Sequence, residues 1–95
     1  MTRAEETASR PHFQLDVTIP RDVRYSDTVR DLAVQAARFA GCSPPDAATF
    51  GRSVATVFDE SLRHGSGDAP IAIVVRRAEG PLEVLVDEQM ITLDL

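Results

Sequence analysis

The sequence has no tryptophan and one cysteine, Cys42, and aromatic residues make up only 5% of it. A single cysteine cannot form an internal disulfide, so packing rather than covalent cross-linking must stabilise the fold. No run of residues approaches the roughly 18 apolar positions that a membrane-spanning helix needs. The first residues also lack the apolar segment of a secretory signal. We therefore expect a cytoplasmic protein with no membrane-embedded part.

Basic residues are scarce as well. Ten Lys and Arg stand against 15 Asp and Glu, which gives a net charge of -5. Binding to nucleic acid draws on concentrated positive charge, so we expect a protein or a small molecule as the partner instead. Neither His12 nor His64 has cysteine or histidine companions at metal-ligand spacing, so no metal site is expected. Cys42 has no evident base partner and is interpreted as a small packing residue.

The remaining composition, 43% apolar and 26% charged residues, is that of an ordinary globular domain. A chain of 95 residues has room for one such domain. Residues 1–11 are polar and end in an Arg-Pro pair, which predicts a disordered N-terminal arm. Residues 12–95 are then expected to form a single folded unit.

Two segments near the start of this unit have clear periodicity. Residues 13–19 alternate apolar and polar side chains, which predicts a strand with one buried face that ends at Pro20. Residues 26–40 repeat apolar side chains every three or four positions, which predicts a helix. We expect Ser26 to cap its first turn and Gly41, in a left-handed conformation, to end it.

A second helix is predicted from Pro44 to about Arg63. Ser43 is placed to cap it, and proline suits the first helical position because no N–H is needed there. Gly51 lies among the apolar positions of this helix, where it would let a neighbouring element approach closely. Residues 65–68 have the composition of a turn.

The last third of the chain predicts strands. Residues 71–77 and 82–87 form two apolar runs joined by a short connection, as in an antiparallel hairpin, and residues 90–95 are a candidate further strand. The order is β-α-α-β-β(-β). We therefore expect an α+β fold, a two-layer sandwich with two helices packed on one face of a mostly antiparallel sheet.

The end of the second helix concentrates ionisable side chains. Thr56, Glu60 and His64 follow one another at four-residue spacing, so they form one polar stripe beside the apolar face and are positioned to line a pocket. The alternative is that Glu60 with His64, and Asp59 with Arg63, form ordinary solvent-facing ion pairs one turn apart. The helix pattern alone favours this alternative.

The ordered series of segments resembles the anti-sigma-factor serine/threonine kinases of the GHKL, or Bergerat-fold, ATPase superfamily, which have a histidine-kinase-like ATPase domain. The similarity covers about residues 13–88 and depends on the series rather than on any single motif. Its segments are Leu15-Asp16-Val17-Thr18-Ile19-Pro20, Val23-Arg24-Tyr25, Val29-Arg30, His64-Gly65, Asp68-Ala69-Pro70-Ile71 and Leu82-Glu83-Val84-Leu85-Val86-Asp87-Glu88.

The resemblance implies roles for the second helix. In the family this helix carries a glutamate that acts on the nucleophile, then an asparagine four residues later that holds Mg²⁺, and it often ends in a His-Gly pair. Aligning His64 and Gly65 with that pair puts Thr56 and Glu60 at the two functional positions. A rival register puts Glu60 at the glutamate and His64 at the asparagine. Threonine cannot act as a carboxylate base, and a glutamate adds negative charge close to phosphates.

The family's adenine-reading aspartate corresponds to Asp87 or Glu88. Glycines normally follow it, whereas residues 89–92 contain none, and bulky side chains would fill space that a nucleotide needs. The sequence ends at Leu95, before the family's ATP lid and closing strands. The resemblance therefore implies a degenerate, truncated domain that needs no cofactor.

These observations predict a non-catalytic protein-interaction regulator that acts in partner switching or stress signalling in bacteria. The expected partner is a sigma factor or an anti-anti-sigma protein. We also expect a homodimer, because missing final strands would leave an open sheet edge. The candidate contact residues are Arg30, Arg38, Thr56, Glu60 and His64.

Two alternatives remain. The first is an ATP-binding serine/threonine kinase with a minimal site, in which Glu60 is the base, His64 and Asp87 contact the nucleotide and Mg²⁺ accompanies ATP. The second is a pocket for another small anion or metabolite at Glu60, His64 and the glycine turn.

Overall fold

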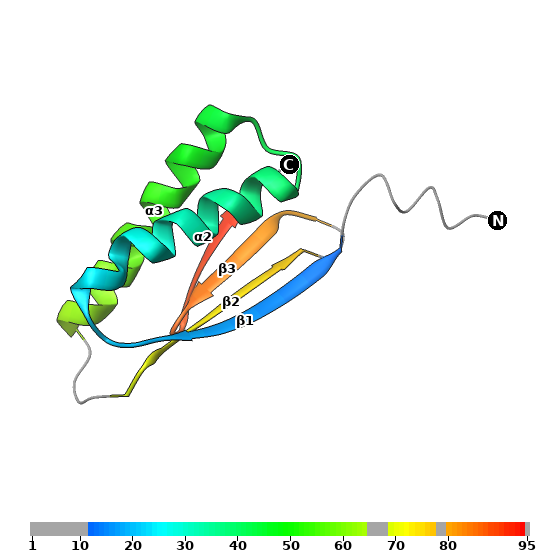
Figure 1. Cartoon of the computed structure of the whole chain (residues 1–95). Coiled ribbons are helices and arrows are strands. Elements are labelled where there is room, and N and C mark those ends of the chain that lie inside the picture. The colour runs from blue at the N-terminus through cyan, green and yellow to red at the C-terminus, as the bar shows by residue number, and fades with distance from the viewer. Residues whose placement is uncertain (1–11, 65–68, 78–79, 95) are drawn as a thin grey trace.

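Two helices lie on one face of a four-stranded antiparallel sheet in a computed structural model, which describes residues 12–64, 69–77 and 80–94 (Figure 1). This confirms the expected two-layer α+β arrangement. The predicted N-terminal arm and the turn at 65–68 lie outside the described residues. The elements are β1 (Phe13–Ile19), the short 3-10 helix η1 (Val23–Tyr25), α2 (Ser26–Phe39), α3 (Pro44–His64), β2 (Ile71–Arg77), β3 (Leu82–Val86) and β4 (Gln89–Leu93).

The strands follow one another across the sheet in the order β1-β2-β3-β4, and every neighbouring pair is antiparallel. β1 pairs with β2 over its full length, from Phe13 opposite Arg77 to Ile19 opposite Ile71. β4 pairs with β3 through a tight hairpin, and it starts at Gln89, one residue before the predicted strand. β1 and β4 are therefore the outer strands.

The start of α2 differs from the prediction. Tyr25, not Ser26, holds the capping position, and it makes no side-chain hydrogen bond to the helix. The reason is that the chain enters α2 directly from η1. Asp22 caps that turn instead, because its Oδ1 accepts a hydrogen bond from the Arg24 N–H at 2.9 Å. At the other end Gly41 has φ 104, which confirms the left-handed termination.

α2 and α3 pack closely at Gly51. A Cβ at this position would overlap Val34 Cγ2 and lie 3.0 Å from the Arg30 carbonyl oxygen. The close approach inferred from the sequence is thus confirmed. The predicted cap of α3 is also present, because Ser43 Oγ accepts a hydrogen bond from the Asp46 N–H at 3.4 Å.

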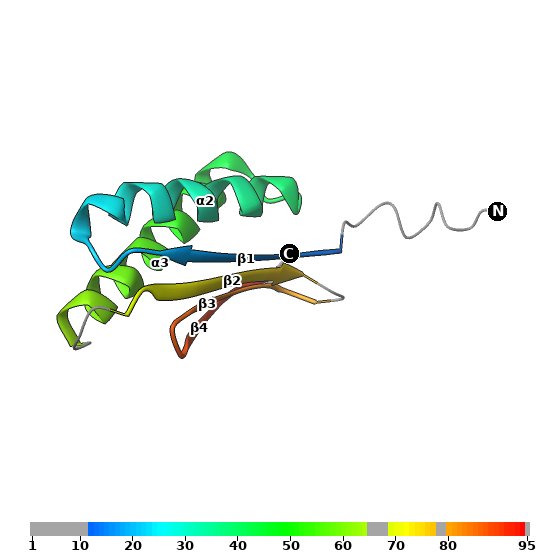
Figure 2. The ribbon, with the colours of Figure 1, turned by 60° about the horizontal axis from the view of Figure 1, so that its bottom comes forward.

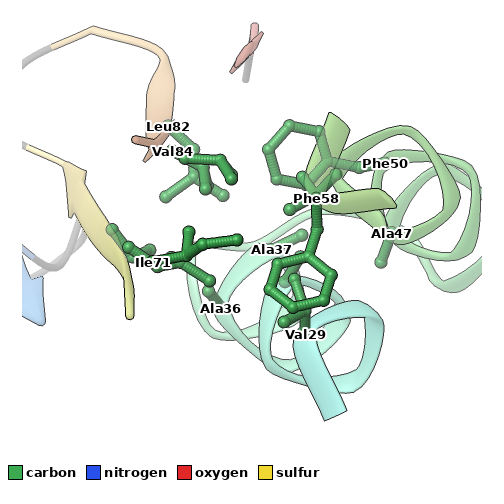
Figure 3. Close-up of a cluster of buried hydrophobic side chains, with 14 residues drawn as sticks. Val29, Ala36, Ala37, Ala47, Phe50, Phe58, Ile71, Leu82 and Val84 are labelled. Atoms are coloured by element: carbon green, nitrogen blue, oxygen red, sulfur yellow. The ribbon is translucent and has the colours of Figure 1, made fainter. Parts of the chain in front are cut away.

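The core lies between the helices and the sheet, and Figure 3 shows Phe50 and Phe58 of α3 directed toward it. Phe58 is fully buried, and burying such a side chain contributes about 1.5–3 kcal/mol. Small alanines on α2 let the helix lie close to its neighbours. The buried hydrophobic cluster comprises Val29, Ala33, Ala36, Ala37, Ala47, Phe50, Val54, Phe58, Ile71, Ile73, Val75, Leu82, Val84 and Val86.

The opposite face of the sheet carries no helix in the described part of the chain (Figure 2). Alternation along the strands places polar and apolar side chains together there. Arg76 and Glu83 form a salt bridge across β2 and β3 at 2.6 Å, whereas Met90 is 50% exposed. This face of the sheet is therefore a mixed polar and apolar surface in the part of the chain that the structure describes.

Candidate functional site

A cavity of about 390 Å³ opens where the C-terminal turn of α3 meets the turn between β3 and β4. Its volume is within the range of small-ligand pockets, about 300–1,000 Å³. The lining residues are Ser61, His64, Asp87, Glu88 and Gln89.

The helical side of the cavity comes from the last turn of α3. Ser61 and His64 are three residues apart, so they project from the same face of the helix. Ser61 is 6% exposed. His64 is exposed at the rim. This side of the cavity therefore combines a buried serine with an exposed histidine.

The other side is the two-residue turn between β3 and β4. Asp87 has φ 57, a left-handed conformation that a non-glycine residue rarely adopts, and its N–H donates to the Ala72 carbonyl at 2.9 Å. Glu88 follows it, and Gln89 begins β4. The tight turn thus fixes two adjacent carboxylates at the cavity.

Arg21 holds the two sides together from behind. Its Nη1 donates to the Ser61 carbonyl at 2.9 Å and its Nε to the Ala69 carbonyl at 3.0 Å. Its Nη2 lies 3.7 Å from Asp87 Oδ2, and the Arg21 side chain is only 15% exposed. One guanidinium therefore connects the end of α3, the segment before β2 and the β3–β4 turn.

The electrostatic character of the cavity is negative. Asp87 and Glu88 contribute carboxylates, and the C-terminus of α3 contributes the negative end of the helix dipole. Arg21 offsets this charge only in part, because its donors are directed at the helix carbonyl, the Ala69 carbonyl and Asp87. A positively charged group is favoured in such a site and a phosphate is disfavoured.

Four sequence-predicted residues end in different surroundings. His64 and Asp87, which the sequence linked through a nucleotide site, line the same cavity. Glu60 is half-buried on α3 but does not line it. Thr56 is exposed, and its hydroxyl donates to the Arg52 carbonyl at 3.0 Å. The stripe of Thr56, Glu60 and His64 therefore does not form a single pocket wall.

The alternative of two solvent-facing ion pairs is not borne out either. In residues 12–64, neither Glu60 with His64 nor Asp59 with Arg63 comes within ion-pair distance. Asp59 is instead half-buried, and its Oδ1 is enclosed without a hydrogen-bond partner. The end of α3 is thus more sheltered than its charged sequence suggests.

The two arginines predicted as contact residues lie on α2, away from the cavity. Arg30 packs its stem against Gly51 and lies 3.5 Å from both Asp27 and Asp31. Arg38 is exposed near the end of the helix. Of these two arginines, Arg30 forms ion pairs, whereas Arg38 forms none with the described residues.

No group of three or more His, Cys, Asp or Glu side chains gathers to hold a metal ion in the part of the chain that the structure describes. Cys42 is half-buried, and burial, aided by the charge of Asp46, raises the pKa of its thiol. The thiol therefore stays protonated at neutral pH.

Across residues 12–64, 69–77 and 80–94, no helix combines the length and the apolar character needed to cross a bilayer.

Sequence reasoning missed Ser61, Gln89 and Arg21 as parts of this site. Ser61 carries a weak signal, since it precedes His64 by one helical turn. Arg21 carries no signal in the sequence, because its three contacts reach residues 40 or more positions away.

Comparisons with protein-family models, with curated proteins and with solved structures found no match. The resemblance to the GHKL superfamily therefore stays a prediction from the sequence.

Proposed function

We propose that this chain is a non-catalytic regulator that binds a protein partner, and that the cavity at the end of α3 receives a lysine or arginine side chain of that partner. The observation that carries the proposal is the pairing of Asp87 and Glu88 with the C-terminus of α3 around one cavity. Following the sequence resemblance, the partner is a sigma factor or an anti-anti-sigma protein in a partner-switching system.

The charge of the cavity favours this function over nucleotide binding. A triphosphate would bring several negative charges next to Asp87 and Glu88, and Arg21, whose donors are already directed at Asp87 and two carbonyls, offsets them only in part. Where the resemblance expects a glycine-rich loop beside the nucleotide, the chain makes a two-residue turn and passes straight into β4. A cationic side chain gains from the same charges, and the Ser61 hydroxyl and the Gln89 side chain add hydrogen-bond acceptors.

The proposal is tested first with short peptides. We expect Gly-Arg-Gly, added to ¹⁵N-labelled protein, to shift the amide signals of His64, Glu88 and Gln89, whereas Gly-Glu-Gly leaves them in place. Glu88→Gln should weaken the response several-fold. Asp94→Asn removes the same charge from an exposed residue outside the cavity and should change little. Equal responses to both peptides would contradict a cation-binding site.

The partner itself is sought by affinity capture from a bacterial lysate and mass spectrometry. The proposal requires a captured protein whose direct binding to the purified chain is lost with Glu88→Lys and kept with Asp94→Asn. A captured protein that binds both variants equally would show that its contact lies elsewhere.

A second function, ATP binding with Mg²⁺, is favoured by one observation: His64 and Asp87 come from distant segments and line the same cavity. On this alternative Glu60 is the catalytic base. Isothermal titration with Mg-ATP separates the two functions. Micromolar affinity that is lost with Asp87→Asn would favour the kinase, and the absence of heat at millimolar nucleotide would favour the non-catalytic regulator.

A further inference from the structure

The outer edge of β1 has few of the features that discourage strand pairing. β1 is seven residues long, and Asp16 is its only charged residue; it contains no proline, lysine or arginine. Among the described residues no strand pairs with its outer edge. Leu15, on the helix-facing side, is 41% exposed. Edges of this kind are normally covered by another strand or protected by charge.

The hydrogen bonds of the sheet show which residues of β1 face outward. The Ala72 carbonyl accepts from the Asp87 N–H, so the backbone groups of Ala72 point toward β3. Backbone direction alternates along an antiparallel strand, so Ile73 points toward β1, where it pairs with Val17. The odd-numbered residues of β1 therefore bond to β2, and the even-numbered ones direct their N–H and C=O groups to the free edge.

Those outward-facing residues are Gln14, Asp16 and Thr18. When two β1 strands pair antiparallel about a two-fold axis, these residues of one copy lie opposite such residues of the other. The residue through which the axis passes lies opposite itself and sets the register. An axis at Asp16 would bring two like charges face to face, which is destabilising. An axis at Val17 would set Gln14 against Pro20, which has no N–H to donate. An axis at Leu15 sets Asp16 against Gln14 of the other copy, a carboxylate against an amide donor.

The flank of α2 above this edge is apolar. Val34 and Arg30 face Gly51 of α3, and at about 100° per residue Leu32 and Phe39 fall on the opposite flank. Phe39 is 64% exposed, and its ring packs edge-on against Phe13 of β1 with centroids 5.3 Å apart. Figure 2 shows α2 lying along β1. The free edge and this flank thus form one continuous surface.

We propose that this surface binds the same surface of a second copy of the chain, with β1 pairing to β1 across a two-fold axis at Leu15. Strands are about 4.8 Å apart and packed helices about 8–10 Å apart, so two helices span four strands. When the β1 strands of the two copies lie one strand spacing apart, the α2 helix of one copy lies about one helix spacing from the α2 helix of the other. Their Leu32 and Phe39 flanks then meet over the joined sheet.

The inference goes beyond the proposed function, because the cavity lies at the end of α3 and not at this edge. Either can fail without the other. The dimer expected from the sequence was attributed to missing final strands, whereas the edge identified here is the first strand. The two-fold arrangement makes the interface self-complementary, so it closes at two copies instead of growing into a fibre.

Light scattering after size exclusion tests the proposal on the full chain in about 150 mM salt, where repulsion between the acidic copies is screened. We expect a mass of about twice 10.4 kDa. Leu15→Lys should give a monomer with unchanged circular dichroism, because this partly exposed side chain can carry a charge into solvent once the partner is gone. A monomeric wild type at millimolar concentration would overturn the proposal, as would a Leu15→Lys protein that stays dimeric.

Cross-linking tests the register independently. An axis at Leu15 makes it a non-hydrogen-bonded pair with its own copy, with Cα atoms about 4.5 Å apart, within reach of a disulfide. In a Cys42→Ser background, Leu15→Cys should give a covalent dimer on mild oxidation. Met90→Cys, at a similarly exposed position on β4, should not. Equal cross-linking of both variants, or none with Leu15→Cys, would exclude this register and favour a strand of another protein as the occupant.

Discussion

The guanidinium of Arg21 lies 3.7 Å from the carboxylate of Asp87 while it also donates to the carbonyls at the end of α3 and before β2. These contacts connect the end of α3 to the segment before β2 and to the β3–β4 turn. Because the side chain is largely buried, its donors are shielded from competing water. Arg21 therefore helps to hold the two sides of the cavity together.

Replacing Arg21 with methionine should therefore destabilise the protein. The change leaves the Ser61 and Ala69 carbonyls without their donor, and we expect a loss of about 1–3 kcal/mol in the free energy of unfolding, measured with urea. Arg24→Met is the matched control, since Arg24 is exposed and its guanidinium interacts with two neighbours in the chain, the carboxylate of Asp22 and the ring of Tyr25. It should cost less than about 1 kcal/mol. Equal losses in both variants would refute a clamping role for Arg21.

Replacing Arg77 with methionine should instead stabilise the protein. Arg77 is 4% exposed, and its Nε and Nη1 have no hydrogen-bond partner among the described residues. A buried guanidinium with two unsatisfied nitrogen atoms is costly, so Arg77→Met should stabilise the protein by about 1–3 kcal/mol in urea unfolding. Arg76→Met, its exposed neighbour, removes the salt bridge to Glu83 and should be neutral or slightly destabilising. A destabilised Arg77→Met protein would show that the guanidinium is satisfied in solution.

Gly51→Ala tests the close packing of α2 against α3. Alanine favours a helix by about 1 kcal/mol over glycine, so an exposed site would be stabilised. Here the new methyl group meets Val34 and the Arg30 backbone, and we expect a net loss of about 1–3 kcal/mol. Adding Val34→Ala should recover part of that loss, because it removes the overlapping methyl groups. Both variants are compared by chemical denaturation, and a stabilised single variant would contradict the packing.

Asp22 should make stability depend on pH. The backbone N–H of Arg24, followed by the charge of its guanidinium, lowers the pKa of the Asp22 carboxyl in the folded state. A lowered folded pKa contributes stability above the ordinary value near about 3.9, and this contribution is lost as the pH falls through the folded pKa. The free energy of unfolding in urea is measured from pH 6 to pH 2. The wild type should be more stable than Asp22→Asn at pH 6, and this difference should disappear as the pH falls to 2. A constant gap would refute the linkage.

The overall fold was predictable because its signals are local. Alternation in residues 13–19, the helical repeat ending at Gly41 and the hairpin pattern each depend on a few neighbouring residues, and each predicted element is present. The buried face expected of residues 13–19 was wrong, because every side chain of β1 is half-buried or exposed. The cap at Ser26 was wrong because the chain turns through η1 first. That turn depends on Asp22, whose capping role is evident only once its neighbours are placed.

The site was predictable only in part. His64 and Asp87 were identified through a family pattern, and they do share a cavity. Arg21 and Ser61 were missed because their roles depend on contacts between segments far apart in the chain. Glu60, predicted from the same helix, is not among the residues that line the cavity, since spacing along a helix fixes a direction but not what lies opposite it.

The pairing of β1 with β2 has a consequence for how the chain folds. It joins residues 13–19 to residues 71–77, whereas β2, β3 and β4 are linked by short hairpins. Closing so long a loop costs more entropy than closing a hairpin and slows folding. During synthesis on the ribosome, β1 therefore emerges long before its neighbour does and stays unpaired until the end of β2 has left the exit tunnel.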